Sequence, residues 1–394
     1  MTKPQIAIVV QRYGSTVLGG AETAAREIAE HLVELGDVHV LTTCAKNFTT
    51  WENSFPPGVN TYNQVTIHRF PVDFTRNWQK EVKQTGQFWQ QNPSLEEQMK
   101  WIQVNGPFST PLIQYIKQNE KTFDVFIFFT YLYATTFFCL PLVAHKSILI
   151  PTAHDEPLLY EEAYRILFNL PHHIIYLTEA EQEITNNVTG NHKTPSTIAA
   201  LGLHMPDNVS AERFRQKHGI YDDFLIYGGR ITQSKNIPEL LDFFQLYQEQ
   251  TWRKLKLVLM GEGNLNIPPH PDIIPIGFVS DEEKFDALKA ASILIQPSHY
   301  ESLSIIMLQA WLMKTMVLVN SQCAVTKQQC QISNGGCYYN TYEEFAGALD
   351  YLMGNPCLRD KLGKQGHKFV LQRYKWEEIM AKYKDAICQI MNCT

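Results

Sequence analysis

The stretch ASILIQPSHYESLSIIMLQAWL, residues 291–312, decides the fold of this chain. It begins with an apolar run typical of a buried strand and passes through a polar turn to Glu301. It then continues as a helical pattern that carries Gln309. A strand, a polar turn and a helix form the repeating unit of parallel sheets with crossover helices. We therefore expect an α/β protein in which this helix begins near Ser302.

The stretch LIYGGRITQSKNIPELL, residues 225–241, has the same order of strand, turn and helix. Its turn places Arg230 and Lys235 just past the carboxyl end of the strand, the edge at which ligands of open α/β sheets bind. A guanidinium offers phosphate oxygens a planar fork of donors, and an ammonium offers a compact charge. The two cations favour a phosphate site, and two solvated loop cations are the alternative.

Apolar runs alternate with helical patterns along the rest of the chain. In the first half, strands are predicted at 5–10, 37–43, 64–72, 124–129, 147–155 and 172–178. After the pattern restarts between 206 and 221, strands are predicted at 223–230, 254–263, 272–279, 292–298 and 316–320. A chain of 394 residues is also too long for one ordinary core. We expect two Rossmann-like domains, 1–206 and 207–374.

Composition limits the class of function. The net charge of −6 argues against nonspecific nucleic-acid binding, which depends on neutralising phosphates. The first apolar run, QIAIVV, is interpreted as a strand and not as a signal peptide. The apolar stretch 126–144 is interrupted by threonines and Pro141, which favours a buried strand and a packed helix over a membrane span. Eight cysteines form no Cys-x-x-Cys pair, which favours free thiols.

The turn between Pro297 and Ser304 offers several groups to an anionic ligand. A helix that begins there presents free backbone N–H groups and the positive end of its dipole. Glu301 would stand beside a bound phosphate and accept hydrogen bonds from sugar hydroxyls, and Gln309 can bond a ribose as donor and acceptor. A capping carboxylate without a ligand is the alternative for Glu301.

His154 follows an apolar strand in LIPTAHDEP and can contact a sugar, whereas a structural histidine bonded to its own loop is the alternative. Gly20 opens the first predicted helix, and Gly229 and Gly261 lie at the ends of predicted strands, where they permit close approach of a ligand to the backbone. The glycines near Gly20 do not match Gly-x-Gly-x-x-Gly, so an NAD-binding domain is weakly supported. The chain contains no Asp-x-Asp pair, so a metal ion bridging carboxylates to a diphosphate is not expected.

Together these segments resemble the glycosyltransferase group 1 family of retaining GT-B glycosyltransferases, which includes many bacterial mannosyl- and glucosyltransferases. The resemblance runs in family order through LGGAETAAREIAEHL, PTAHDEP, YLTEAEQEI, GGRITQSKNIPELL, VLMGEG, IGFVSDEE and ILIQPSHYESLSIIMLQA. It implies two Rossmann-like domains facing across a cleft, with the donor on the second and the acceptor on the first. It also implies that a C-terminal helix, 375–394, crosses back to the first domain.

The resemblance assigns roles to individual residues. It implies that Arg230 and Lys235 hold the donor diphosphate, that Glu301 contacts the donor sugar, and that His154 is the histidine of the first domain. These four are the expected catalytic residues. The expected donor-binding residues are Gly20, Gly229, Gly261, Val279, Ser302, Leu303, Ser304 and Gln309.

The implied activity is transfer of a hexose from a nucleotide diphosphate sugar to a hydroxyl of a glycan, lipid or small molecule. It implies retention of anomeric configuration without a metal or a separate cofactor. We expect a cytoplasmic enzyme of polysaccharide biosynthesis, with peripheral contact at the inner face of the membrane left open. The alternative is a non-catalytic GT-B subunit that binds a sugar nucleotide or a glycan, because Gln309 and Ser304 replace a glutamate and a glycine of the family pattern. A GT-B epimerase or phosphorylase is a second alternative, and no motif supports the pyridoxal phosphate lysine of a phosphorylase.

The segment 74–121 is rich in aromatic side chains and is expected to be helical. Its aromatic residues, among them Phe74, Trp78, Phe88, Trp89 and Trp101, can form an acceptor wall, a membrane-surface helix or plain core. The near balance of basic and acidic residues in the segment disfavours binding to anionic lipid. Plain core is the favoured interpretation.

Overall fold

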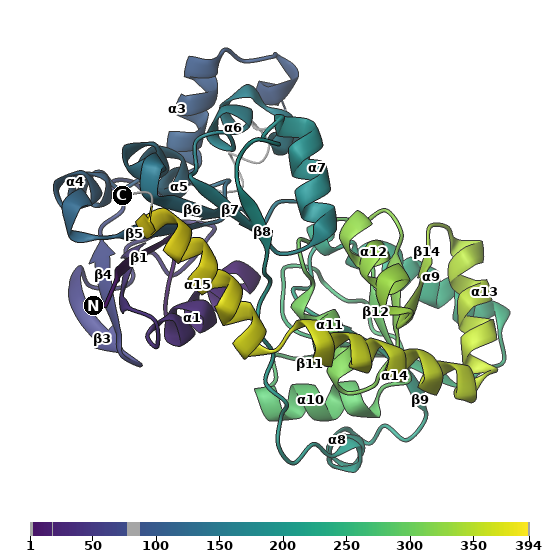
Figure 1. The fold of residues 1–394 in the computed structure, drawn as a ribbon. Helices are drawn as coiled ribbons and strands as arrows, with labels where there is room; N and C mark the ends of the chain where they lie inside the picture. Colours follow the sequence, from purple (N-terminus) through teal and green to yellow (C-terminus); the bar gives the residue numbers. More distant parts are fainter. Residues whose placement is uncertain (1–2, 18, 77–86, 393–394) are drawn as a thin grey trace. The chain divides into compact units, whose positions relative to one another are not determined.

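The computed structural model describes residues 3–17, 19–76 and 87–392 and divides the chain into two compact units. The first unit comprises Met1–Leu201 and Glu377–Thr394, and the second comprises Gly202–Trp376. The domain boundaries predicted from the sequence, after 206 and after 374, lie within a few residues of these divisions. Each unit is an α/β structure built on one sheet, so the predicted fold class is confirmed (Figure 1).

The first unit contains an eight-stranded sheet in the order β3-β4-β2-β1-β5-β6-β7-β8. Neighbouring strands are parallel except at the edge pair of β3 and β4. The strands are β1 (Gln5–Val10), β2 (Asp37–Thr43), β3 (Gly58–Tyr62), β4 (Val65–Phe70), β5 (Val125–Phe129), β6 (Ser147–Ile150), β7 (His173–Tyr176) and β8 (Ser196–Ile198). Central strands such as β5 are buried along their whole length because helices cover both faces of a parallel sheet.

Helices connect the strands of the first unit. They are α1 (Gly20–Leu32), α3 (Leu95–Asn105), α4 (Thr110–Gln118), α5 (Ala134–Cys139), α6 (Glu162–Leu167) and α7 (Glu179–Thr189), with the short helices η1 (Glu120–Thr122), η2 (Leu140–Lys146) and η3 (Pro157–Tyr160). The predicted strand and helix within 126–144 are confirmed as β5 and α5. None of the described helices combines the length and the apolar character that a membrane-spanning helix needs.

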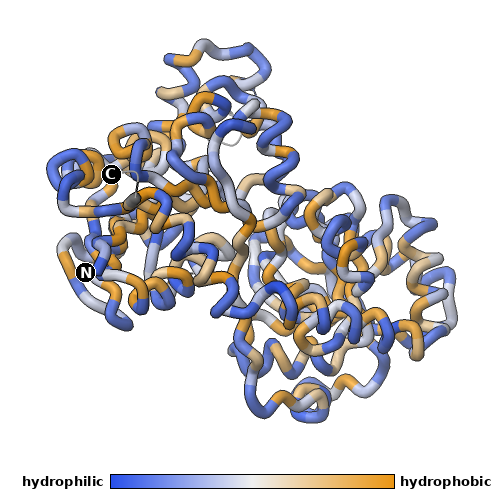
Figure 2. Tube along the Cα trace, in the orientation of Figure 1, coloured by the Kyte–Doolittle hydropathy of each residue, from blue (hydrophilic) through white to orange (hydrophobic). Residues whose placement is uncertain are grey.

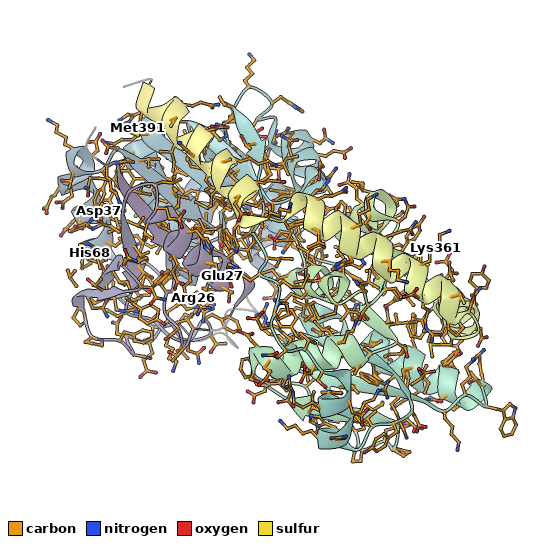
Figure 3. The ribbon with its side chains drawn as sticks, turned by 60° about the horizontal axis from the view of Figure 1, so that its bottom comes forward. Arg26, Glu27, Asp37, His68, Lys361 and Met391 are labelled. Atoms are coloured by element: carbon orange, nitrogen blue, oxygen red, sulfur yellow. The ribbon has the colours of Figure 1, made fainter. Side chains whose placement is uncertain are left out.

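The last helix, α15 (Trp376–Asn392), belongs to the first unit from Glu377 onward. Tyr383 and Ile390 on this helix are fully buried, and Lys382 Nζ donates to the carbonyl oxygen of Ile198 at 2.9 Å. Figure 3 shows Met391 at the far end of α15. The C-terminal segment therefore completes the first unit by covering part of its surface.

The second unit contains a six-stranded sheet, all of it parallel, in the order β11-β10-β9-β12-β13-β14. The strands are β9 (Asp223–Gly228), β10 (Leu255–Met260), β11 (Ile273–Gly277), β12 (Ile293–Gln296), β13 (Val317–Asn320) and β14 (Gly336–Tyr339). The helices are α8 (Ala211–His218), η4 (Gln233–Lys235), α9 (Ile237–Gln250), α10 (Asp281–Ala290), α11 (Ile305–Leu312), α12 (Ala324–Ser333), α13 (Tyr342–Met353) and α14 (Pro356–Arg373). Figure 2 shows hydrophobic residues along the strands and polar residues on the outer helices.

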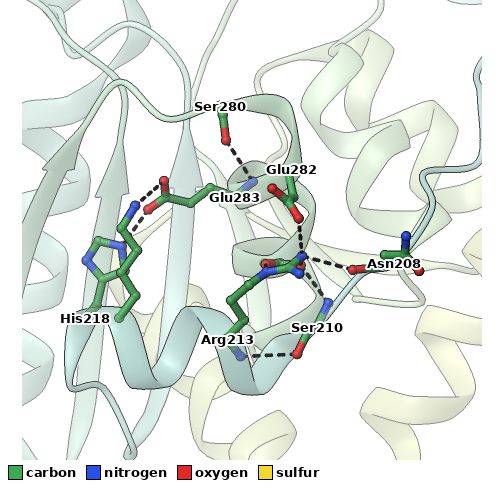
Figure 4. Close-up of polar contacts among 9 residues, drawn as sticks. Asn208, Ser210, Arg213, His218, Ser280, Glu282 and Glu283 are labelled. Atoms are coloured by element: carbon green, nitrogen blue, oxygen red, sulfur yellow. Dashed lines mark hydrogen bonds and ion pairs between the residues drawn. The ribbon is translucent and has the colours of Figure 1, made fainter.

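A polar cluster fastens the first helix of the second unit to α10 (Figure 4). The buried carboxylate of Asp286 accepts from Arg213 Nε at 2.5 Å, from Arg213 Nη2 at 2.9 Å and from the backbone N–H of Ser210 at 2.6 Å. One turn further along α8, His218 Nε2 lies 2.8 Å from Glu283 Oε1. This cluster fixes α8 where the second unit begins.

Three strands escaped prediction because their sequences lack a strong apolar pattern. All five residues of β3 are exposed, β8 has three residues, and β14 begins with a glycine. Each lies at an edge of its sheet, where one side needs no partner. The apolar periodicity that identified the inner strands is therefore absent from these positions.

The aromatic segment is helical in α3 and α4 but not at 74–76 or 106–109, and 77–86, which includes Trp78, lies outside the described residues. Trp89 and Trp101 meet edge to face at 5.0 Å between ring centroids, and Phe88 stacks on Trp101 at 6.4 Å. Trp101 packs against the core while half-buried. Phe74 is exposed, so the core interpretation is wrong for that residue.

Candidate functional site

The order of strands in the second unit reverses between β9 and β12. The chain proceeds from β9 through β10 to β11 on one side and continues with β12 on the other side of β9. Ligands of open α/β sheets bind outside the carboxyl ends of strands at such a reversal. The loop after β9 carries Arg230 and Lys235, and the loop after β12 carries Glu301. The topology therefore brings these two predicted loops to one edge of the sheet.

Lys235 and Glu301 are in direct contact at this edge. Lys235 Nζ lies 2.5 Å from Glu301 Oε1, and the two side chains are 21% and 13% exposed. Partial burial makes such a pair stronger than a solvent-exposed one. Arg230 is exposed on the same loop, and its carbonyl oxygen accepts a hydrogen bond of 2.8 Å from the Tyr227 hydroxyl. This edge of the sheet thus carries the ion pair of Lys235 and Glu301, and the loop of Lys235 carries a second, exposed cation, Arg230.

The helix after Glu301 begins later than the sequence indicated. Ser304 has φ 59° and ψ 74°, a left-handed conformation that cannot continue a right-handed helix. The expected start near Ser302 is therefore wrong, and α11 begins at Ile305. Gln296 Nε2 donates to Ser304 Oγ at 2.8 Å, and both side chains are buried. This hydrogen bond fixes the turn to the end of β12.

The other candidates on this turn differ in accessibility. Ser302 and Gln309 are half-buried, so their side chains retain some exposed surface. Leu303 is buried, which leaves only its backbone as a contact for a donor. Among these candidates, Ser302 and Gln309 can therefore offer their side chains to a donor, and Leu303 only its backbone.

The glycine turns after β9 and β10 pack against each other. Gly229 N–H donates to Met260 O at 2.9 Å, and Ile231 N–H donates to Glu262 O at 2.9 Å. A Cβ atom at Gly261, where φ is 137°, would overlap the carbonyl oxygen of Gly229. These contacts give Gly261 a packing role that is independent of any ligand.

Val279 follows β11, the strand at the edge of the second sheet. Its side chain is half-buried, and its neighbour Phe278 is 62% exposed. Gly277 O accepts from Gly261 N–H at 2.8 Å, which connects this segment to the glycine turns. The exposed ring of Phe278 thus lies next in sequence to Val279, which the family resemblance assigns to donor binding.

In the first unit, His154 lies in the loop after β6 and is 25% exposed. Its Nδ1 lies 3.4 Å from Glu156 Oε1, which also accepts a hydrogen bond of 2.8 Å from the Tyr131 hydroxyl. Burial raises the pKa of the Glu156 carboxyl, and nearby His154 opposes that change. The histidine therefore lies beside a mostly buried carboxyl group.

Glu181 holds the backbone of the His154 loop through a hydrogen bond from Ala153 N–H. This role was not predicted from the sequence. The carboxylate of Glu181 is fully buried and accepts from the backbone N–H groups of Ala153 and Leu177, each at 2.6 Å. The hydroxyl of Thr178 caps α7 by accepting from Glu181 N–H at 3.1 Å. The order Thr-x-x-Glu before a helix is a capping-box signal, which predicts the start of α7 but not the contact of Glu181 with the His154 loop.

Gly20 begins α1, and no atom lies within 4 Å of the position that a Cβ there would occupy. Two residues further on, Glu22 is buried and its Oε1 accepts from Gln11 Nε2 at 2.9 Å and from Arg12 Nε at 3.0 Å. This ion pair at the end of β1 was not predicted, because its partners come from a strand and a helix. The space next to the Cα atom of Gly20, where a Cβ atom would lie, is open.

No metal-binding cluster is found in the part of the chain that the structure describes. Within 3–17, 19–76 and 87–392 there is no group of three or more His, Cys, Asp or Glu side chains placed to hold a metal ion. The cysteines at 44, 139, 323, 330, 337, 357 and 388 are free thiols, as predicted, and Cys393 lies outside the described residues.

The two α/β units define the GT-B fold. Sucrose-phosphate synthase from Thermosynechococcus elongatus matches with a TM-score of 0.71 at 13% identity, over 99% of both chains. HepE from Anabaena, solved in complex with UDP-glucose, matches with a TM-score of 0.70 at 12% identity, over 99% of this chain and 100% of that one. At such low identity these likenesses establish the fold and no more.

A family match covers most of the second unit. Residues 210–369 match the family described as glycosyl transferases group 1, so the resemblance seen in the sequence is confirmed over that region. An uncharacterised glycosyltransferase of Methanocaldococcus jannaschii is 25% identical over 178 residues. That match covers 42% of this chain and 45% of the relative, so the chain is matched to less than half of the relative's length.

Proposed function

We propose that the protein is a retaining glycosyltransferase that moves a hexose from a nucleotide diphosphate sugar to an acceptor hydroxyl. The observation that carries this proposal is the contact between Lys235 and Glu301 at the strand-order reversal of the second unit. The match of residues 210–369 to the glycosyl transferases group 1 family supports it. Because HepE, which has the same fold, was solved with UDP-glucose, a UDP-sugar is the first donor to test.

In the proposed site, different residues bind the diphosphate and the sugar of the donor. Lys235 and exposed Arg230 neutralise the diphosphate, and the N-terminus of the eight-residue helix α11 adds its dipole. Glu301 accepts hydrogen bonds from hydroxyls of the sugar, and Gln309 bonds the ribose. Fixed charges of this kind stabilise a leaving group without having to reorganise during the reaction.

The proposed reaction proceeds on one face of the sugar. The bond between the anomeric carbon and the diphosphate oxygen breaks, and a bond from the acceptor oxygen to the same carbon forms on the same side. The acceptor proton passes to the departing phosphate oxygen, so no protein nucleophile is required. The protein contributes positioning and charge stabilisation. We propose that these cations act without a metal ion, as the sequence led us to expect.

We assign the acceptor to the first unit, beside His154. The half-buried imidazole, held next to Glu156, can donate to or accept from a hydroxyl. A glycan acceptor fits the proposed role in polysaccharide biosynthesis, and a lipid or a small molecule would use the same hydroxyl chemistry.

Donor binding is tested by thermal shift with UDP-, GDP- and ADP-sugars, with and without magnesium. A ligand that binds the folded state raises the melting temperature. Lys235→Ala should abolish the shift seen with wild type. Lys256→Ala is the matched control, because Lys256 Nζ also pairs with a carboxylate at 2.5 Å, on Asp272, away from the site. No shift with any donor, or equal loss in both variants, contradicts the proposal.

The second candidate is a non-catalytic subunit that binds a sugar nucleotide or glycan. The side chains at 304 and 309 favour it, because the family pattern has a glycine and a glutamate there. This candidate predicts a donor-dependent thermal shift without any turnover. If the function of the protein in cells survives Glu301→Ala, the non-catalytic role is supported. If Glu301→Ala abolishes that function, the transferase is supported.

A further inference from the structure

Asn236 links the proposed donor-binding lysine to the rest of the site. It follows Lys235 directly, ends the short helix η4 and precedes α9. Its backbone has φ 58° and ψ 30°, which is the left-handed region. Asparagine and glycine adopt this conformation more readily than other residues. The direction in which Lys235 leaves the backbone therefore depends on a residue that tolerates this turn.

The side-chain amide of Asn236 bridges two loops. Its Nδ2 lies 2.7 Å from Glu239 Oε1, 3.2 Å from the carbonyl oxygen of Pro297 and 3.0 Å from His299 Nε2. Pro297 and His299 lie in the loop after β12, four and two residues before Glu301. The amide thus connects the loop of Lys235 to the loop of Glu301.

These contacts also fix the orientation of the amide. All three neighbours of Nδ2 can act as acceptors, and an amide nitrogen has two protons to share among them. Glu239 Oε1 accepts a second hydrogen bond, from Asn320 Nδ2 at 3.0 Å. Asn320 ends β13, so the carboxylate of Glu239 extends the network to a third strand end. A rotated amide would place its oxygen against a carboxylate and a carbonyl.

We propose that Asn236 is a positioning residue that holds Lys235 in register with Glu301. This inference rests on the proposed function and adds to it a residue that touches neither phosphate nor sugar. Its left-handed backbone aims Lys235 towards the loop after β12, and its amide fixes the separation of the two loops. The distance of 2.5 Å between Lys235 Nζ and Glu301 Oε1 is the geometry that this arrangement maintains.

Three substitutions separate the two contributions. Asn236→Gly keeps the left-handed backbone and removes the amide, and Asn236→Ala removes both. Asn236→Asp keeps the backbone but places a carboxylate against Glu239, where like charges repel. Asn334→Gly is the matched control, because Asn334 is exposed, has φ 49° and caps α12 in the same unit.

The first experiment needs no ligand. The rate at which Lys235 is acetylated by a small amine-reactive reagent is measured by mass spectrometry in the full-length protein. A lysine held in a half-buried ion pair reacts slowly, so Asn236→Gly should label Lys235 at least severalfold faster than wild type. Asn334→Gly should leave the rate unchanged. An unchanged rate in Asn236→Gly overturns the proposal.

The second experiment measures nucleotide affinity in a double-mutant cycle. If Asn236 acts through Lys235, Asn236→Gly weakens UDP binding in wild type but has no further effect in Lys235→Ala. Equal loss of affinity in both backgrounds would mean a merely structural role and would overturn the proposal. Melting temperatures of all variants establish that they are folded, and Asn236→Gly replaces Asn236→Ala if the latter does not fold.

The two experiments distinguish the further inference from the proposed function. If wild type binds none of UDP, GDP and ADP, the proposed function fails. The labelling rates still decide whether Asn236 positions Lys235, because they depend only on the ligand-free protein. If wild type binds UDP and the cycle shows no coupling, the proposed function stands and the role of Asn236 is disproved.

Discussion

Lys235 Nζ lies 2.5 Å from Glu301 Oε1, so the ligand-free protein pairs the cation proposed for the diphosphate with the carboxylate proposed for the sugar. Each group neutralises the other while the site is without a donor. A donor must then replace this contact with its own phosphate oxygens and hydroxyls. In the proposed site, the ion pair would therefore couple binding of the diphosphate to binding of the sugar.

Glu301→Gln separates these two contributions. The amide no longer competes for Lys235, so the Kd for UDP should stay within about threefold of wild type or decrease. UDP-glucose should lose its advantage over UDP, because the sugar hydroxyls lose a charged acceptor worth about 1.5–3 kcal/mol, or roughly 10–100-fold in Kd. Calorimetric titration with both ligands measures the difference. If Glu301→Gln weakens binding of UDP as strongly as it weakens binding of UDP-glucose, the carboxylate has no specific role at the sugar.

The sequence identified the residues of this contact but could not place them together. Glu301 and Lys235 each follow a predicted strand, and motif order suggested one site. That β9 and β12 are neighbours depends on sheet order, which emerges only from the packing of the whole unit. Asn236 and Glu181 escaped prediction for a related reason. Their importance lies in hydrogen bonds to backbone atoms of distant loops, and such bonds leave no periodic pattern in the sequence.

The buried carboxyl group of Glu181 makes the stability of the first unit depend on pH. Burial raises its pKa from 4.5 to about 8, and the hydrogen bonds from Leu177 and Ala153 only partly oppose this. The unfolded chain loses this proton near pH 4.5 and the folded chain near pH 8, so the folded state binds more protons between these values. Glu181 should therefore lower the stability as pH rises through this window, by up to about 1.4 kcal/mol per pH unit.

Scanning calorimetry measures how the melting temperature depends on pH. The range from about pH 5 to 9 covers most of the window in which the carboxyl group titrates. Glu181→Gln should flatten the decrease in melting temperature, even though it also loses a backbone hydrogen bond and lowers stability at all pH values. Glu183→Gln, on the exposed side of the same helix, should retain the wild-type slope. The prediction is wrong if both variants show the same slope.

Asp286→Asn tests the cluster that fastens α8 to α10. The single oxygen of the amide can accept only some of the hydrogen bonds that the carboxylate accepts from Arg213 and from Ser210 N–H. We expect a loss of about 2 kcal/mol in the free energy of unfolding, at the modest end for a charged hydrogen bond because Arg213 is partly exposed. Asp281→Asn, which removes an exposed partner of Lys284 on the same helix, should cost less than about 1 kcal/mol. Denaturant titration compares the two variants, and equal losses would show that burial of Asp286 is unimportant.

Ser304→Gly asks whether the serine at the turn before α11 obstructs the donor. Ser304 Oγ is bonded to buried Gln296, so its side chain is held against the end of β12. Glycine would relieve the left-handed strain, roughly 1 kcal/mol, and lose a hydrogen bond of about the same strength. We therefore expect little change in stability and a Kd for UDP-glucose within about threefold of wild type. Ser304→Ala, which loses the hydrogen bond and keeps the strain, should be less stable by about 1 kcal/mol. A tenfold or greater gain in affinity for Ser304→Gly would instead show that the serine crowds the donor, which would favour the non-catalytic alternative.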